Sequence, residues 1–209
     1  MMILAFEFSA AQRSVALARD GVILAETAET GGYRVTNAFG LAEKILSAAK
    51  ISRAEVEVIA VGLGPGSYTG IRAAIAVAQG WQLARGVKLL GVSSADCLAA
   101  QAQAAQIFGR VNVVIDAQRS EFYLGSWDIS GTERQAVAPL KIVTAAEITA
   151  RQAAGEICVG PEMKPVLFPS AAMVARLATG RTDFVPGEKL EPVYLRAISF
   201  VKAAPGRVY

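Results

Sequence analysis

Histidine is absent from the sequence, which has 209 residues. Its absence excludes the catalytic triad that depends on histidine, the His-Glu-x-x-His metal site and the zinc sites that mix histidine with cysteine. Any chemistry carried out by this chain has to use carboxylate, amine, guanidinium, hydroxyl or thiol side chains.

Cysteine is scarce as well, with Cys97 and Cys158 as the only two. They lack a Cys-x-x-Cys spacing and lie in unlike surroundings, so we expect buried free thiols and not a disulfide or a metal site. Because histidine is missing too, we predict no bound zinc or iron and no cofactor.

Long apolar runs are also missing, although 53% of the residues are hydrophobic and suffice for a globular core. The longest candidate, residues 71–83, is interrupted by Arg72, Gln79 and Gln82. It is shorter than the roughly 18 residues that a membrane span requires. The first residues reach Glu7 before any long apolar segment, which is typical of a first strand and not of a signal peptide. We therefore expect a cytoplasmic protein without a membrane segment.

Clusters of one charge are not found either. The formal net charge is +3, and the basic residues are scattered along the chain. A dedicated nucleic-acid binder usually concentrates its basic residues. The sequence therefore does not predict that this chain binds RNA strongly by itself.

What the sequence does have is a glycine-rich segment at residues 61–72, between an apolar run and an alanine-rich run. This order predicts a strand, a loop of defined shape and a helix that Ser67 or Thr69 caps. Free N–H groups at the positive end of such a helix can bind an anion. The loop residues Gly64, Gly66, Ser67, Thr69 and Gly70 therefore form a candidate phosphate site.

Neither nucleotide-binding motif is complete in this loop. A Walker A loop has Lys before its last Ser or Thr, but here Ile71 follows Gly70. The dinucleotide fingerprint needs a third glycine where Thr69 stands. The favoured interpretation is structural: the glycines let the helix cross close to the sheet.

A weak internal repeat organises the chain. Strands are predicted at 3–8, 14–19, 22–27, 57–63 and 88–92, with helices near 39–49 and 70–85 and from 93 toward 107. The pattern then starts again with strands at 111–116, 121–127 and 156–160 and helices at 145–152 and 171–177. We therefore predict two α/β lobes with mixed sheets facing a cleft, at residues 1–95 and 96–209.

An acid ends the first strand of each half, Glu7 in one and Asp116 in the other. Facing each other across a cleft, the two carboxylates could hold a hydrated Mg²⁺ with nucleotide phosphates. Alternatively, each acid only accepts N–H groups of the turn that follows. The second interpretation is favoured, because Pro161 follows a strand where a nucleotide site requires several glycines.

Two helices carry a possible partner surface. We expect the helices near 37–49 and 70–85 to lie side by side on one face of the first sheet, each with a free apolar flank. Core packing alone remains the other interpretation of the same residues. The predicted surface residues are Leu41, Ile45, Ile71, Ile75, Ala78 and Gln82.

Four motifs together resemble the TsaB family, also called YeaZ, nearly end to end. They are Gly-Leu-Gly-Pro-Gly-Ser-Tyr-Thr-Gly-Ile-Arg at 62–72, Gly-Val-Ser-Ser at 91–94, Val-Ile-Asp-Ala-Gln-Arg-Ser-Glu-Phe-Tyr at 114–123 and Pro-Val-Tyr-Leu-Arg at 192–196. The resemblance implies the two-lobed fold of actin, sugar kinases and Hsp70, a duplicated ribonuclease H-like α/β fold. It also implies a role in making N6-threonylcarbamoyladenosine at position 37 of tRNAs that read codons beginning with A.

In that pathway TsaB is understood as a non-catalytic scaffold for its paralogue TsaD, so the chain itself is not expected to be an enzyme. TsaD transfers the threonylcarbamoyl group from the adenylate made by TsaC, and the ATPase TsaE completes the assembly. The resemblance implies that a homodimer and the TsaD complex compete for one surface, and that tRNA is met only through the complex. TsaD holds its metal with histidines, which this chain lacks.

Two alternatives stay open: a nucleotide-dependent kinase or ATPase of the same fold and, as related proteins were once labelled, a metallopeptidase. Two departures from the family bear on them. Glu7, Phe8 and Ser9 stand where members usually have Asp-Thr-Ser, and Phe8 would crowd a phosphate there. At the start of the first helix the usual Ser-His-Ser is replaced, although Thr36 or Asn37 can still cap that helix.

Overall fold

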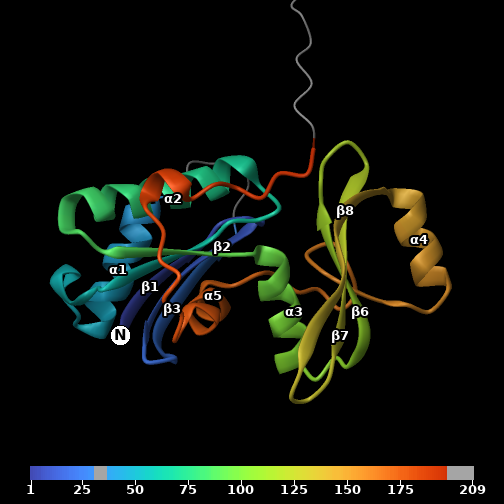
Figure 1. Ribbon diagram of the computed structural model, residues 1–209, viewed down its shortest axis with the longest axis horizontal. Coiled ribbons are helices and arrows are strands. Elements are labelled where there is room, and N and C mark those ends of the chain that lie inside the picture. The colour runs from blue at the N-terminus through green and yellow to red at the C-terminus, as the bar shows by residue number, and fades with distance from the viewer. Residues whose placement is uncertain (31–36, 197–209) are drawn as a thin grey trace, which may run out of the picture.

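The computed structural model describes residues 1–30 and 37–196, which form two β-sheets flanked by helices (Figure 1). The strand order is β3-β2-β1-β4-β5 in the first sheet and β8-β7-β6-β9 in the second. The strands are β1 (Met2–Glu7), β2 (Gln12–Arg19), β3 (Val22–Thr30), β4 (Val58–Gly62), β5 (Lys88–Val92), β6 (Gly109–Asp116), β7 (Glu121–Ile129), β8 (Arg134–Thr144) and β9 (Ile157–Val159). The helices are α1 (Ala38–Ala49), α2 (Tyr68–Arg85), α3 (Ser94–Ala104), α4 (Ala145–Ala153) and α5 (Ala171–Ala178), with short 3-10 turns η1 (Arg53–Glu55) and η2 (Gly187–Lys189).

The central strand β1 shows why the first sheet is covered on both faces. Leu4 and Phe6 pack into one apolar cluster, whereas Ile3 and Ala5 pack into another. Successive side chains of a strand point to opposite faces, so a strand that is apolar throughout needs a cover on each side. Parallel pairing of β1 with β4 and of β4 with β5 also requires crossover connections, and these carry α1 and α2.

Helices α1 and α2 lie side by side on one face of the first sheet and contact each other, as the sequence predicted. The opposite face is covered by α5, which contacts all five strands of this sheet. We call the first sheet with α1, α2 and α5 lobe 1. It holds the larger part of the apolar core.

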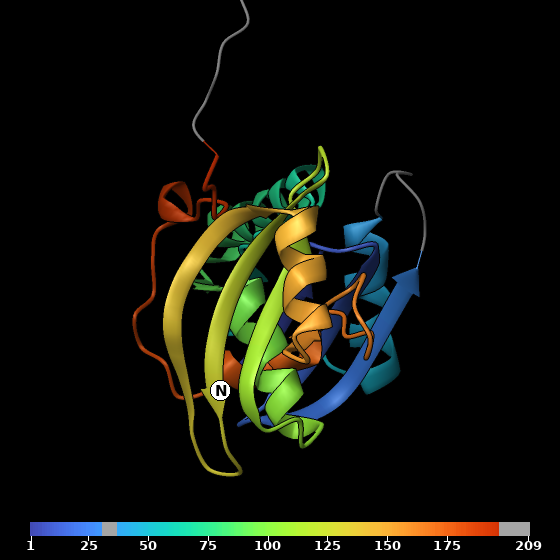
Figure 2. The same cartoon turned by 90° about the vertical axis from the view of Figure 1, so that its right-hand side faces the viewer.

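The second sheet with α4 forms lobe 2, seen from its outer side in Figure 2. Helix α4 packs on the outer face, where Ile148 meets Val114 and Leu124. Helix α3 lies between the lobes: Leu98 and Ala102 pack on the second sheet, whereas other residues of α3 join the apolar cluster of α5 and the first sheet. The lobes are therefore joined through a shared helix.

The order β-β-β-α-β-α occurs twice, from β1 to α2 and from β6 to α5. This duplication confirms the predicted two-lobed α/β fold with mixed sheets, the fold of actin, sugar kinases and Hsp70. A lobe boundary between residues 95 and 96 remains a prediction, and α5 shows that residues of the second half also cover the first sheet.

Smaller expectations have mixed outcomes. Asn37 caps α1, because its side chain accepts a hydrogen bond from the Gly40 N–H at 2.9 Å; the other proposed cap, Thr36, lies outside the described residues. No strand was predicted at β8, an edge strand with few buried residues.

Both cysteines are buried free thiols, as the sequence predicted. In the part of the chain that the structure describes, no helix is long and apolar enough to cross a membrane.

Candidate functional site at the interlobe cavity

The glycine-rich loop joins β4 to α2 and lies directly against the turn between β1 and β2. Ser67 caps α2, accepting a hydrogen bond from the Gly70 N–H at 3.4 Å. The Ser67 N–H donates to the Ser9 carbonyl oxygen at 2.7 Å. A Cβ on Gly66 would overlap that same oxygen, and one on Gly70 would overlap the Phe8 carbonyl oxygen. The two glycines thus permit the close crossing that the sequence favoured.

Glu7, the last residue of β1, is fully buried and is not among the residues that line the cavity between the lobes. Its carboxylate accepts hydrogen bonds from the Ser9 N–H at 2.7 Å and from the Ser94 hydroxyl at 2.8 Å. The Ser94 oxygen in turn accepts from the Gly64 N–H at 3.0 Å. Burial raises the pKa of Glu7, an effect that these hydrogen bonds partly offset. Glu7 therefore joins the first turn, the glycine loop and the start of α3.

Asp116 occupies the corresponding place at the end of β6. Its carboxylate accepts from the Gln118 backbone N–H at 2.8 Å and from the Gln118 side-chain amide at 2.6 Å. Glu7 and Asp116 thus each accept the N–H of the residue two positions later, as the structural interpretation of these acids proposed. Only Asp116 faces the cavity, so the structure does not bring the two acids together as a pair of metal ligands.

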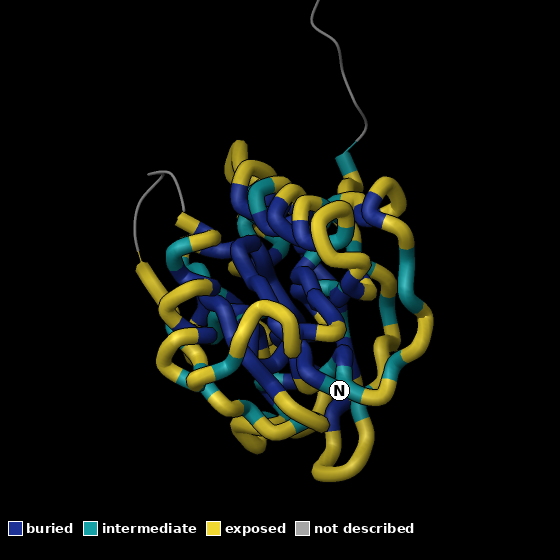
Figure 3. Tube along the Cα trace, turned by 90° about the vertical axis from the view of Figure 1, so that its left-hand side faces the viewer, coloured by how far each residue is buried: buried dark blue, intermediate teal, exposed yellow. Residues whose placement is uncertain are grey.

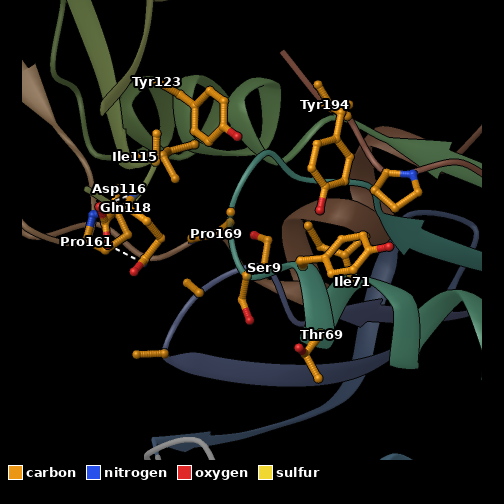
Figure 4. A pocket seen from close by; sticks show the side chains of 18 of the residues that line it. Ser9, Thr69, Ile71, Ile115, Asp116, Gln118, Tyr123, Pro161, Pro169 and Tyr194 are labelled. Carbon is orange, nitrogen blue, oxygen red and sulfur yellow. Dashed lines mark hydrogen bonds between the residues drawn. The ribbon is translucent and has the colours of Figure 1, made fainter. Parts of the chain in front are cut away.

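A cavity of about 680 Å³ lies between the lobes (Figure 4). Sites for small molecules usually have about 300 to 1,000 Å³. Lobe 1 contributes the β1–β2 turn and the start of α2, and lobe 2 contributes the hairpin that follows β6. The lining residues include Ser9, Arg13, Gly66, Ser67, Tyr68, Thr69, Ile71, Ile115, Asp116, Gln118, Arg119, Tyr123, Pro161, Glu162, Pro169, Val193, Tyr194 and Arg196.

The polar groups of this cavity have mixed charge. Arg13 and Arg119 line it together with Asp116 and Glu162. Burial raises the pKa of Glu162, and the nearby charge of Asp116 raises it further. Phe8, where the resembling family has a hydroxyl residue, is fully buried in the core beneath α1 and α2. Among the described residues, no three His, Cys, Asp or Glu side chains come together as a metal site would require.

The predicted partner surface needs a correction. Leu41, Ile45, Ile71, Ile75 and Ala78 are buried in the core between α1, α2 and the first sheet, so the expectation that they form an exposed strip is wrong. Figure 3 shows buried and exposed residues alternating along the helices of this side. These positions recur every three or four residues and form the face that meets the sheet. The sixth residue, Gln82, is partly buried and accepts from the Gly187 N–H at 2.8 Å.

The opposite face of α2 is the exposed one. Ala76, Gly80 and Leu83 are exposed, and Leu83 is 90% exposed. Their spacing of four and three residues places them on one side of the helix. A Cβ on Gly80 would meet no atom within 4 Å. We call Ala76, Gly80 and Leu83 the α2 seam; its small residues leave room for another helix to approach closely.

Three features of the site were not predicted from the sequence. One is the hydrogen bond that the Ser94 hydroxyl donates to Glu7. Tyr194 and Arg196 were noted only as part of a family motif, yet they line the cavity. No local pattern signals these roles, because each depends on contacts between residues far apart in the chain.

Two lobes built from a duplicated β-β-β-α-β-α unit around an interlobe cavity define a protein of the actin-like class. The family model described as TsaD, tRNA N6-adenosine threonylcarbamoyltransferase, matches residues 32–185. The tRNA threonylcarbamoyladenosine biosynthesis protein TsaB of Escherichia coli is 30% identical over 99% of this chain and 100% of its own length.

Other relatives agree with this match. The TsaB protein of Bacillus subtilis is 28% identical over 66% of this chain and 60% of its own length. The solved structure of YeaZ from Pseudomonas aeruginosa superposes with a TM-score of 0.77 and 26% identity, covering 93% of this chain and 99% of that one. The chain therefore belongs to the TsaB family, also called YeaZ.

Proposed function

We propose that this chain takes part in the synthesis of N6-threonylcarbamoyladenosine at position 37 of tRNAs that read codons beginning with A. The observation that carries the proposal is the 30% identity to the Escherichia coli TsaB protein over the full length of that protein. The match of residues 32–185 to the TsaD model supports the further view that the chain is a paralogue of TsaD.

Within that pathway we propose a non-catalytic role. Three observations support it: the chain has no histidine, Glu7 is used inside the core, and the buried Phe8 replaces a hydroxyl residue near the cavity. The chain would act in the cytoplasm as a scaffold for a TsaD-type transferase, together with TsaC-type and TsaE-type proteins. It would meet tRNA only through that complex.

The corrected partner surface is the α2 seam with the exposed residues of α1 beside it. An apolar side chain as exposed as Leu83 gains stability when a partner covers it. A TsaD-type chain has a related lobe 1, so it can offer an equivalent pair of helices. We expect the isolated chain to form a homodimer through the same surface, and the partner to displace the second copy.

Reconstitution of the modification from purified TsaC-type, TsaD-type and TsaE-type proteins of one organism tests this role. Product nucleoside in the tRNA should form only when this chain is added. Asp116→Asn should support the same rate as the wild type, because the cavity does no chemistry. A rate that does not depend on this chain would refute the proposed function.

The competing function is that of a nucleotide-dependent kinase or ATPase, which the cavity and its Asp116 favour. It requires that the chain alone binds ATP with Mg²⁺ and hydrolyses it. Turnover by the purified chain that disappears in Asp116→Ala would establish this second function and contradict the non-catalytic one.

A further inference from the structure

The C-terminal part of the described chain, residues 187–196, runs over lobe 1 and ends on lobe 2. We call these residues the strap. Its first anchor is on α2: the Gly187 N–H donates to the Gln82 side chain at 2.8 Å, and the Gln79 side chain donates to the Gly187 carbonyl at 2.8 Å. Leu190 is buried in the core of lobe 1. The start of the strap is therefore fixed to lobe 1 by both polar and apolar contacts.

Two further contacts hold the strap on lobe 1 just before it leaves. The Val193 N–H donates to the Leu63 carbonyl at 2.8 Å, directly after β4. The ring of Tyr194 meets the ring of Tyr68 edge to face, with 5.1 Å between the centroids. Figure 4 shows Tyr194 at the wall of the cavity opposite Tyr123 of lobe 2.

The side chain of Arg196 then makes hydrogen bonds to lobe 2. The Arg196 guanidinium donates to the Ala117 carbonyl at 2.9 Å and to the Glu121 carboxylate at 2.6 Å. Both acceptors belong to the hairpin that joins β6 and β7, where the Ala117 N–H also donates to the Glu121 carbonyl at 2.9 Å. Arg196 thus binds both a backbone carbonyl and a side chain of a hydrogen-bonded turn.

The length of chain between the two anchors limits how far the lobes can move. Only three residue steps separate Val193 on lobe 1 from Arg196 on lobe 2, about 10 Å at full extension. Away from the strap, the lobes are joined by α3, which packs on both sheets, and by the connection from β9 to α5. With Arg196 released, α3 and this connection would be left as a hinge.

We propose that the strap sets the width of the interlobe cavity and that the contact of Arg196 with Ala117 and Glu121 is the latch that keeps it closed. The latch is suited to reversible release, because Arg196 and Glu121 are each about one third exposed, at 31% and 37%. A contact buried in the core could not break without unfolding its surroundings. A partly exposed contact at the rim of the cavity can break while both lobes stay folded.

Distances between two spin labels test the proposal in the full chain. One label is placed on lobe 1 at Ala54→Cys and the other on lobe 2 at Ala146→Cys, both exposed positions. The buried Cys97 and Cys158 should react little, and the chain without added cysteines measures that background. Arg196→Gln removes the latch, and Glu121→Gln weakens it by removing the ion pair while leaving the Ala117 carbonyl as an acceptor. The matched control is Arg110→Gln, which breaks the Arg110–Asp128 pair inside lobe 2.

Each latch variant should shift the distance distribution to longer values and broaden it. The Arg110→Gln control should give the same distribution as the doubly labelled chain with an intact latch. Arg196→Lys, which keeps a positive charge opposite Glu121, should give an intermediate distribution. The double variant should match Arg196→Gln, because Arg196 makes both hydrogen bonds of the latch. If Arg196→Gln does not fold, Glu121→Gln alone decides. If the folded latch variants give the same distance distribution as the doubly labelled chain with an intact latch, the proposal is overturned.

Discussion

Glu7 is the residue that contributes most to the local structure behind the cavity. It is a fully buried carboxylate whose two oxygens hold the Ser9 N–H and the Ser94 hydroxyl. A buried acid is costly when ionised, and its hydrogen bonds offset only part of that cost. The side chain therefore makes the stability of lobe 1 depend on pH.

The direction of that dependence follows from the raised pKa. A carboxyl group whose pKa is higher in the folded state adds stability fully below its ordinary value of 4.5, and loses that contribution as the pH rises through the raised folded value. Glu7→Gln cannot ionise and should not lose it. The free energy of unfolding of Glu7→Gln relative to that of the wild type should therefore rise as the pH increases above 4.5.

Urea unfolding at several pH values measures this difference. Glu7→Ala is the control that separates ionisation from packing. It should be less stable than wild type, because it leaves a cavity and two buried donors unpaired, each costing about 1 to 3 kcal/mol. A difference between Glu7→Gln and wild type that does not change with pH would show that the pKa of Glu7 is not raised in the folded protein.

At the scale of elements, α2 has two faces with opposite roles. Ile71, Ile75 and Ala78 pack on the first sheet, whereas Ala76, Gly80 and Leu83 are exposed. The sequence predicted this helix, with Ser67 or Thr69 as its cap, but the prediction placed Ile71, Ile75 and Ala78 on an exposed flank and was wrong. The larger Ile side chains mark the inward face in the structure, because they gain more from burial than alanine does.

Two glycines of α2 give a matched test of this assignment. Gly70→Ala should lower the free energy of unfolding by about 2 to 4 kcal/mol, because its Cβ would overlap the Phe8 carbonyl oxygen. Gly80→Ala faces open space and should raise it by up to about 1 kcal/mol, since alanine favours helix more than glycine does. Thermal or urea unfolding of both variants measures these changes in the free energy of unfolding. Equal effects of the two substitutions would contradict the close crossing at Gly70.

Strand β8 shows where prediction of elements stops. The strands with apolar residues on both faces, such as β1 and β4, were evident from composition alone. The edge strand β8 carries Pro139 and mostly exposed residues, and it is ordered through pairing with β7. Its sequence therefore lacks the apolar alternation by which a strand is recognised.

At the scale of the whole molecule, the duplicated order of elements was predictable and the contacts between the halves were not. The repeat of a meander followed by helices predicts two facing lobes. That Ser94 of α3 binds Glu7, and that Arg196 reaches the β6–β7 hairpin, are contacts across 87 and 75 positions of sequence. Such contacts leave no periodic signal, so the walls of the cavity could be assigned only from the structure.

In the function that we propose, this chain serves a TsaD-type transferase as a scaffold through the α2 seam. Ala76→Arg places a charge in the middle of that seam without touching the core. Ala78→Arg is the neighbouring control: Ala78 is fully buried, so this variant should lose its folded state. In sedimentation experiments we expect the wild type to be a homodimer and the folded Ala76→Arg variant to be a monomer.

Calorimetric titration of a TsaD-type partner with the wild type and with Ala76→Arg measures how much the α2 seam contributes to the affinity. A buried charge without a counter-charge costs about 3 to 5 kcal/mol. We therefore expect the folded Ala76→Arg variant to bind the partner at least about 100-fold more weakly than the wild type does. Equal affinity of the two proteins would contradict it.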